Sequence, residues 1–482
     1  MATTSRKWGE LMIVLTAPLL SVIDVFIINV AIPAIKKGVH ATDGEIQLVI
    51  AGYLLGYAAF LITGGRAGDH FGRKKVFFWG MLAFTVASCL CGLSMTPLQL
   101  NVTRFFQGVS ASFMVPQTIA YIQVIFTGRE ERTKAIGYFG ITLGIAAMIG
   151  QFLGGYLSDS HFAIEGWRLI FFINLPVGIA ALWTTHRYLE ETPKNNTSVF
   201  DYSGVGILTV GLVALIYPLI QGRESGWPLW SILMLGGAAL VFVYFIRHQR
   251  RKLFANKAPL VNVRLFRFKD FNLGLLTVLF FFMLHTAYLL IITVYLQGGL
   301  GFSAFDCGLF FIAMGIMFTI ASMLSIHYVV KYGKRVLQVG VVIMIAALIM
   351  ELLVFGFHAN HISMLVLMAI YGLGSGLVLP SLLNMALKSV PVEFAGAAAG
   401  VYSTFQQTAS ALGISIIGGV FFFFVETGDY TKAFDYGMVA NIICAVIVGV
   451  LLYLLPDKRE VAAPAGNTAV SRAPVEEEMI FE

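Results

Sequence analysis

Fourteen runs of mostly apolar residues, each about as long as a membrane-spanning helix, follow one another along the chain. A helix needs about 20 such residues to cross the hydrocarbon layer of a bilayer. Of the 482 residues, 58% are hydrophobic and only 12% are charged, whereas soluble domains carry about 25% charged residues. The sequence therefore predicts an all-α membrane protein with 14 transmembrane helices. The expected spans are 11–32, 45–64, 76–95, 97–118, 134–157, 168–187, 203–221, 227–246, 271–296, 303–327, 336–357, 361–387, 396–424 and 436–455.

Lysine and arginine are unevenly distributed among the loops between these spans. If there are fourteen spans, the basic loops, such as 65–75 and 247–269, all fall on one side. Because basic loops remain in the cytoplasm, we expect a multi-pass protein of the cell inner (plasma) membrane with both termini cytoplasmic. This distribution also accounts for the net charge of +6 without a nucleic-acid partner. The expected surroundings are the lipid bilayer.

The two ends of the chain repeat each other. Gly108 precedes Pro116 by eight residues, as Gly372 precedes Pro380, and the two glycines are 264 residues apart. The pair Gly154-Gly155 returns as Gly418-Gly419 at the same offset, and HFGRKK at 70–75 is echoed by KYGKRV at 331–336. We therefore expect two related six-helix bundles joined by an insertion. The expected division is 1–190 for the N-terminal bundle, 191–250 for an inserted two-helix hairpin, 251–270 for a cytoplasmic linker, 271–456 for the C-terminal bundle and 457–482 for a disordered cytoplasmic tail.

Two opposite charges lie at matching depths in different spans. Asp24 is about 12 Å, and Arg104 about 10 Å, from the same side of the membrane at 1.5 Å per residue. An unpaired charge at this depth is costly, so we expect Arg104 to face Asp24 or polar groups beside it. Burial favours a neutral carboxyl and a nearby arginine favours the charged form, so Asp24 is the expected proton-coupling site, with Arg104 as its helper. A structural role for Arg104, bound to backbone carbonyls, is the alternative.

A second intramembrane carboxylate, Glu351, lies about 9 Å from that side in its span. It is expected either to take part in proton coupling or to neutralise a cationic substrate; the alternative is a carboxylate that reaches the membrane interface. His285 lies near the middle of its span. It is expected to contribute to substrate or proton handling, or else to form a hydrogen bond between helices.

Polar and aromatic side chains within the spans are candidates for a substrate-binding cavity. Some of them would instead join helices, and a phenylalanine could equally face lipid. The candidates are Asn29, Gln107, Gln117, Gln151, Phe281, His285, Tyr288, Asn384, Gln406 and Gln407.

The charged stretch GRAGDHFGRKK between the second and third spans resembles a loop signature of the major facilitator superfamily. The whole pattern is similar to its fourteen-span drug:proton antiporter family, because the first and fourth spans also match, through Asp24, Asn29, Ala31 and Pro33, and through Arg104, Gln107 and Gly108. The resemblance implies the major facilitator fold and a part in proton transfer for Arg104. It also implies a conformational gate at the cytoplasmic side, formed by Gly65, Asp69, Gly72, Arg73 and Lys74.

The sequence departs from the family pattern at three places, one of which is His70 in the loop signature, where the family usually has arginine. Gln151 stands where the fifth span usually has a proline, and the thirteenth span carries Gln406 and Gln407 where some multidrug members have a carboxylate. The resemblance implies a proton-coupled antiporter that exports amphipathic small molecules or drugs. A dedicated exporter or proton symporter of one metabolite or siderophore remains open. A membrane sensor or scaffold built on a transporter fold is a third possibility.

Catalytic and cofactor signatures are not apparent in the sequence. No nucleotide-binding loop, metal-ligand cluster or nucleophile–base arrangement stands out. We therefore expect neither an enzyme nor a bound metal or cofactor. The expected partners are protons and a small-molecule substrate, and the expected state is a monomer.

Overall fold

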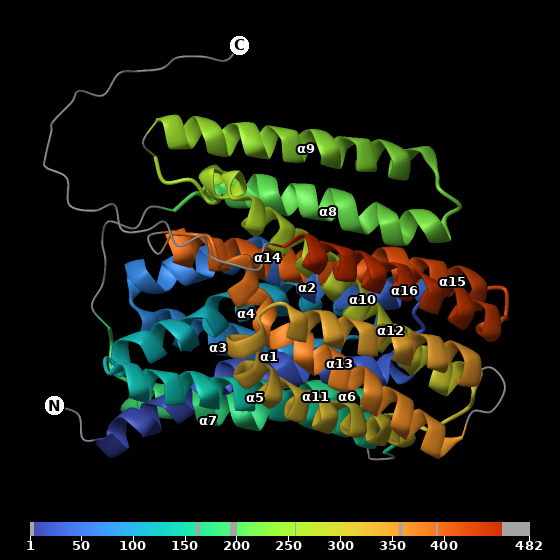
Figure 1. Ribbon diagram of the computed structural model, residues 1–482. Coiled ribbons are helices and arrows are strands. Elements are labelled where there is room, and N and C mark those ends of the chain that lie inside the picture. Colours follow the sequence, from blue (N-terminus) through green and yellow to red (C-terminus); the bar gives the residue numbers. More distant parts are fainter. Residues whose placement is uncertain are drawn as a thin grey trace, which may run out of the picture.

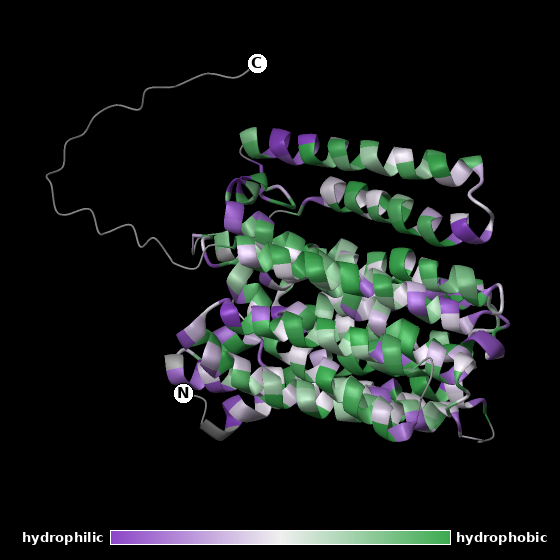
Figure 2. Ribbon diagram, turned by 45° about the vertical axis from the view of Figure 1, so that its right-hand side comes forward, coloured by the Kyte–Doolittle hydropathy of each residue, from purple (hydrophilic) through white to green (hydrophobic). Residues whose placement is uncertain are grey.

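The computed structural model describes residues 4–160, 164–192, 200–255, 257–355, 360–391 and 394–455. All regular elements in these ranges are helices, and fourteen of the helical segments are long and apolar enough to cross a membrane. Their middles are hydrophobic and their polar residues gather toward the ends (Figure 2). The predicted fourteen spans are thus confirmed. The predicted tail, 457–482, lies outside the described residues.

The N-terminal half holds six spans, of which the sixth is broken in two. Pro176 lacks the N–H that would bind the carbonyl of Phe172, and the break falls at Ile173, directly after that carbonyl. The helices are α1 (Thr4–Gly38), α2 (Asp43–Phe71), α3 (Arg73–Leu93), α4 (Pro97–Ile125), α5 (Arg129–Ser158), α6 (Gly166–Phe172) and α7 (Asn174–Tyr188).

The C-terminal half repeats this arrangement, and two of its spans contain a π-helical segment. Its elements are α10 (Lys269–Val294), the π segment η2 (Tyr295–Gly299), α11 (Ala304–Tyr332), α12 (Arg335–Phe355), α13 (His361–Ala386), α14 (Ala395–Leu412), the π segment η4 (Gly413–Ile417), α15 (Gly418–Val425) and α16 (Tyr430–Leu454).

The packing of the two halves follows the repeat in the sequence. In the first half α2 and α3 pack on α4, and in the second half α11 and α12 pack on α13. The halves meet along two equivalent contacts, α5 against α11 and α14 against α2. The structure is therefore the major facilitator fold, with two six-helix bundles related by an internal repeat.

The inserted helices α8 (Tyr202–Glu224) and α9 (Leu229–Phe254) lie outside both bundles (Figure 1). Helix α8 packs on α2 of the first half and also touches α14 and α15 of the second, and α9 packs on α8. Because α9 continues to Phe254, it extends past the predicted start of the linker at 251. The chain then forms a short 3-10 helix, η1 (Val263–Arg267), before α10.

Asp201 joins the inserted hairpin to the linker. Its carboxylate accepts hydrogen bonds from Lys252 and Gln249 of α9, from the backbone N–H of Gly204 at the start of α8 (2.6 Å) and from that of Leu260 in the linker (2.9 Å). Burial alone would raise the pKa of Asp201, but these hydrogen bonds outweigh it and hold the pKa well below its usual range. The Asp201 carboxylate therefore joins the hairpin and the linker into one unit.

The stretch predicted as a loop, 65–75, is almost entirely helical. Helix α2 continues to Phe71 and α3 begins at Arg73, so Gly72 alone separates them. Gly72 has φ +101°, a conformation that only glycine adopts easily, and Gly333 at the equivalent junction of α11 and α12 also has a positive φ. We call the end of the bundle that holds this junction the Gly72 end, and the opposite end, where α2 begins, the Asp43 end.

Candidate proton and substrate sites

A buried ion pair joins α1 to α4 inside the N-terminal half. The Nη1 atom of Arg104 donates to Oδ2 of Asp24 at 2.5 Å, and both side chains are at most 1% exposed. Gln107, one helical turn after Arg104, donates from Nε2 to Oδ1 of Asp24 at 2.8 Å and accepts from Nη1 of Arg104 at 2.7 Å. The pairing predicted from matching depths is therefore confirmed, although its role in proton coupling remains a prediction.

Helix α2 holds the arginine of this pair in place. Nε of Arg104 donates to the carbonyl oxygen of Val49 at 3.1 Å, and the guanidinium lies 4.5 Å from the ring centre of Tyr53. The hydroxyl of Tyr53 bonds in turn to Ser21 of α1 at 2.7 Å. The backbone contact predicted as the alternative for Arg104 is thus present together with the ion pair. Arg104 is therefore held by α2 as well as by its partner Asp24.

Asn174 is a third partner of Asp24, and the residue patterns assigned it no role. It lies at the first position of α7, directly after the break in the sixth span. Its Nδ2 donates to Oδ1 of Asp24 at 3.3 Å and to the hydroxyl of Ser88 at 2.9 Å, while its own Oδ1 has no hydrogen-bond partner among the described residues. Its signal in the sequence is an amide side chain two residues before Pro176, in the run FFINLP.

A second buried carboxylate lies in the C-terminal half. The hydroxyl of Tyr288, on α10, donates to Oε1 of Glu351, on α12, at 2.8 Å, and Glu351 is fully buried. Its other oxygen, Oε2, has no hydrogen-bond partner among the described residues. Glu351 therefore does not reach the membrane interface. It retains one oxygen that can accept a hydrogen bond from a proton donor or a substrate.

Aromatic rings surround this carboxylate. Tyr371 of α13 stacks on Tyr288 with ring centres 3.8 Å apart, and His285 lies parallel to both Tyr371 and Phe281. Nδ1 of His285 and the hydroxyl of Tyr371 are 3.2 Å apart, which is the hydrogen bond between helices expected as one alternative for His285. The structure thus brings together Phe281, His285, Tyr288 and Glu351, and it adds Tyr371, which the sequence patterns had not singled out.

The other predicted cavity residues occupy different surroundings. Gln117 is buried and donates to the backbone carbonyls of Gly64 and Phe113, so it joins α4 to α2. Asn29 and Gln151 are buried, and each has a side-chain atom without a partner among the described residues. By contrast, Asn384 is exposed, and Gln406 and Gln407 are half-buried.

The predicted gate residues form contacts around the α2–α3 junction. Arg73 pairs with Asp69 at 2.9 Å and donates to the carbonyl oxygen of Ala120 in α4 at 3.1 Å. Glu191, distant in sequence, accepts from the backbone N–H groups of Lys74 and Lys75 at the start of α3. A carboxylate at a helix N-terminus is favourable because free N–H groups point toward it. Gly72 leaves room for Glu191, since a Cβ there would lie 2.6 Å from its carboxylate carbon.

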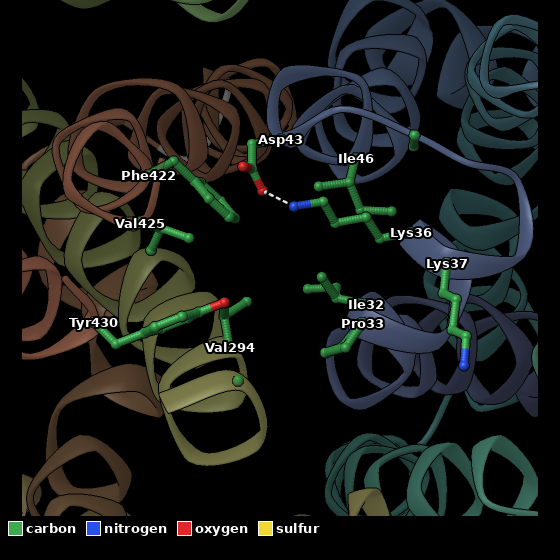
Figure 3. A pocket seen from close by; sticks show the side chains of 12 residues that line it. Ile32, Pro33, Lys36, Lys37, Asp43, Ile46, Val294, Phe422, Val425 and Tyr430 are labelled. Atoms are coloured by element: carbon green, nitrogen blue, oxygen red, sulfur yellow. Dashed lines mark hydrogen bonds and ion pairs between the residues drawn. The ribbon is translucent and has the colours of Figure 1, made fainter. Parts of the chain in front are cut away.

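A cleft of about 310 Å³ lies between the two halves at the Asp43 end (Figure 3). Its N-terminal wall includes Lys36 and Asp43, which form an ion pair of 2.5 Å. Its C-terminal wall includes Val294, Val425 and Tyr430. The cleft is mostly apolar with a charged rim, and it marks the seam along which the halves would separate at this end.

Relatives with similar sequences include several proteins named for transport or drug resistance. The chain is 35% identical to the "Probable actinorhodin transporter" of Streptomyces coelicolor over 87% of this chain and 73% of that protein. It is 31% identical to the "Multidrug resistance protein Stp" of Mycobacterium tuberculosis, over 83% of this chain and 73% of the relative. It is 30% identical to the "Puromycin resistance protein pur8" of Streptomyces alboniger, over 97% of this chain and 95% of the relative.

Solved structures of transporters share the fold. A D-xylose–proton symporter matches with a TM-score of 0.66 and 14% identity over 93% of this chain and 98% of the symporter. A bacterial homologue of the lysosomal transporter Spinster matches with a TM-score of 0.67 and 14% identity over 94% of this chain and 97% of the homologue. A sequence profile of the Major Facilitator Superfamily matches residues 14–414. The chain therefore belongs to the major facilitator superfamily.

Proposed function

We propose that this protein exports amphipathic small molecules in exchange for protons, and that Asp24 is the group that carries the proton. The observation that carries the proposal is the fully buried ion pair between Asp24 and Arg104, which belong to different helices of one half. Several relatives are named as drug or antibiotic resistance proteins, and this supports export as the direction of transport.

The surroundings of Asp24 suit reversible protonation. The charged form is stabilised by donors from Arg104, Gln107 and Asn174, while burial opposes it. A change in access or in these contacts shifts this balance, so that the carboxylate takes up a proton from one side of the membrane and releases it to the other. Arg104 keeps its contacts to Val49 and Tyr53 and stabilises the anion after release.

The aromatic cluster of the C-terminal half is the proposed second site. Glu351 has one unpaired buried oxygen next to the rings of Tyr288 and Tyr371, and such a group can neutralise a cationic, aromatic substrate or carry a second proton. Phe281 and His285 complete the wall, and Asn29, Gln107, Gln117, Gln151, Asn384, Gln406 and Gln407 are the remaining proposed binding residues.

The α2–α3 junction is the proposed conformational gate. Gly65, Asp69, Gly72, Arg73 and Lys74 lie at the Gly72 end, which we assign to the cytoplasm from the distribution of basic residues. With this orientation, we propose that both chain termini lie in the cytoplasm and that the protein lies in the inner (plasma) membrane. We also propose that it acts as a monomer divided into the bundles 1–190 and 271–456, the hairpin 191–250, the linker 251–270 and the tail 457–482.

A dedicated exporter of one natural product is the second candidate. The relatives named for actinorhodin, puromycin and tetracenomycin C favour it, because each name refers to a single compound. Both candidates share the proton-coupled mechanism and differ only in the range of substrates.

Transport by purified protein in proteoliposomes tests the proposal. The probes are puromycin and a cationic dye such as ethidium, and the readouts are probe movement and the pH inside the vesicles. Antiport predicts that protons flow down the imposed gradient and that each probe crosses the membrane in the opposite direction. Proton and probe movement in the same direction would show a symporter, and movement of a probe without any movement of protons would refute the coupling.

A further inference from the structure

The inserted hairpin α8–α9 has no counterpart in the two six-span halves, and the proton and substrate sites do not use it. At the Asp43 end, however, two adjacent residues of α8 contact opposite halves of the protein. These are Arg223 and Glu224, in the last turn of the helix.

Glu224 is fixed to the N-terminal half. Its carboxylate accepts a hydrogen bond from the Thr42 hydroxyl at 3.0 Å and a second one from the backbone N–H of Gly44, in the first turn of α2. Gly44 is needed there, because a Cβ would lie 2.6 Å from the Glu224 carboxylate carbon. Gln221 supports the carboxylate from within α8 at 3.0 Å. Glu224 therefore adds a cap to the N-terminus of α2, where a negative charge is favourable.

Arg223 contacts the C-terminal half. Its Nη1 donates to Oε1 of Glu426 at 2.6 Å, directly after α15, and its side chain is only 7% exposed. The remaining nitrogens, Nε and Nη2, are buried and have no partner among the described residues. A buried arginine with a single partner that is itself 40% exposed is held less firmly than Arg104, which has four contacts.

At the Gly72 end the hairpin is again bound to α2. Arg66 of α2 donates to the carbonyl oxygens of Pro259, at 2.8 Å, and Leu260, at 3.4 Å. The N–H of Leu260 in turn donates to Asp201, which holds the start of α8 and the end of α9. Helix α8 is thus attached to α2 at both ends, whereas Arg223–Glu426 is its one ion pair with the C-terminal half among the described residues.

The two links are adjacent in sequence to residues that line the cleft between the halves, among them Asp43 and Val425, which Figure 3 labels. Gly44, which Glu224 binds, directly follows Asp43 of the N-terminal wall, and Glu426 directly follows Val425 of the C-terminal wall. Two hydrogen bonds also join the halves directly, from Gln297 to the carbonyl oxygen of Val30 and from the N–H of Phe305 to Asp159. For the hairpin, separation of the walls requires that one of its two links break. The single ion pair of Arg223 is the weaker of the two.

We propose that Arg223 and Glu224 form a latch that closes the Asp43 end. The hairpin moves with the N-terminal half, held by Glu224 and by the Arg66–linker contacts, and the Arg223–Glu426 ion pair breaks each time this end opens. The latch biases the conformational equilibrium toward the closed state, as interface ion pairs do in other two-state proteins. It acts independently of which molecule is carried and of which residue takes the proton.

Distances between spin labels test the latch directly. In a variant with Cys89, Cys91, Cys307 and Cys444 replaced by serine or alanine, one label pair joins Lys37 to Thr431 across the cleft. All labelled positions, including Ser225 on the hairpin, are exposed. Pulsed electron paramagnetic resonance in lipid nanodiscs then gives the fractions of short and long distances.

Loss of the ion pair should open the cleft. Arg223→Gln and Glu426→Gln should each raise the ratio of long to short Lys37–Thr431 distances by about fivefold. This factor is at the lower end of the coupling usually measured between two sites of a protein. Lys432→Gln is the matched control, because it removes a positive charge at the same end whose partner, Asp429, lies in the same half. It should leave the distribution unchanged. Equal distributions in wild type, R223Q and E426Q would overturn the proposal.

The direction of hairpin movement is tested in the latch-intact protein. When the Lys37–Thr431 distance lengthens, at a pH that opens the wild type, the Ser225–Lys37 distance should stay constant and the Ser225–Thr431 distance should lengthen with it. The opposite pattern, with Ser225 staying near Thr431, would show that the hairpin moves with the C-terminal half and would refute the assignment.

Discussion

Asp24 and Arg104, which lie 80 residues apart in the sequence, form an ion pair of 2.5 Å that is inaccessible to solvent. Each charge alone would be expensive in the interior of a membrane protein. Together they join α1 to α4 and keep a titratable carboxylate at a defined position. The pair therefore has a structural effect, and we propose that it also serves proton coupling; mutations can separate the two roles.

Removal of the arginine should destabilise the protein more than removal of both charges. Arg104→Gln leaves Asp24 buried without its cation, and we expect a loss of about 3–5 kcal/mol in unfolding free energy. The double variant Arg104→Gln with Asp24→Asn should regain most of that loss. Thermal unfolding of the purified variants in one detergent measures the coupling. Additive effects of the two substitutions would contradict a direct interaction.

Asn174 should contribute to the same network. Asn174→Leu removes the hydrogen bonds to Asp24 and Ser88, so we expect a loss of about 1–3 kcal/mol in stability together with slower proton-coupled export. Asn441→Leu is the matched control, because Asn441 is equally buried in α16 but neither side-chain atom has a partner among the described residues. Equal losses in both variants, measured by thermal unfolding and by export, would remove any special role for Asn174.

The spans and the ion pair could be predicted because both depend mainly on positions along the chain. A membrane helix must be long and apolar, so fourteen runs could be counted, and depth along a helix follows from rise per residue. The charge pair was found because two depths matched. Rotation of a helix about its axis has no such signal in one intramembrane sequence, since the lipid-facing and protein-facing sides are both apolar.

Contacts set by rotation or by chain breaks were therefore missed. Asn174 reaches Asp24 because the sixth span breaks at Ile173, and Glu191 reaches the start of α3 from a segment 117 residues away. Gln117, a proposed cavity residue, also donates a hydrogen bond to the backbone of α2, which the sequence did not indicate. The stretch 65–75 was expected to be a loop because it is charged, yet it continues α2 to Phe71 and begins α3 at Arg73.

The close approach of α5 to α11 should depend on Gly155. A Cβ at this position would lie 2.4 Å from the carbonyl oxygen of Ala304. Gly155→Ala should therefore lower the free energy of unfolding by about 1–3 kcal/mol and slow transport. Gly137, in the same helix, has nothing within 4 Å of a built Cβ. Gly137→Ala should therefore be neutral or stabilising, by up to about 1 kcal/mol. Thermal unfolding and export rates of the two variants provide the comparison, and a tolerated G155A would show that this contact is not tight.

Asp201 should stabilise the hairpin–linker unit in a pH-dependent way. Its pKa is lower in the folded protein than in the unfolded chain, so its contribution is complete above pH about 4 and is lost as the pH falls below that value. Asp201→Asn should lower the free energy of unfolding by about 2–3 kcal/mol at neutral pH. It should also abolish the loss of stability that protonation of Asp201 causes at low pH. Hydrogen exchange of residues 257–268 at pH 7 and at about pH 2.5, below the ordinary pKa of an aspartate, measures both effects.

A second helix-capping carboxylate provides the control for Asp201. Asp429 accepts from the backbone N–H of Lys432 at the start of α16, but it is exposed and far from the linker. Asp429→Asn should leave exchange of the linker unchanged. Linker protection that is the same in D201N and in wild type would show that the Asp201 contacts do not hold the unit together.

Transport by Asp24→Asn in proteoliposomes tests the central claim most directly. Asparagine has nearly the size of aspartate but no carboxyl group that can bind and release a proton. We therefore predict that D24N no longer moves protons with substrate and no longer accumulates substrate against a gradient. It should still exchange labelled for unlabelled substrate at a rate that does not vary with pH. Proton movement and pH dependence equal to those of the wild type would contradict Asp24 as the coupling site.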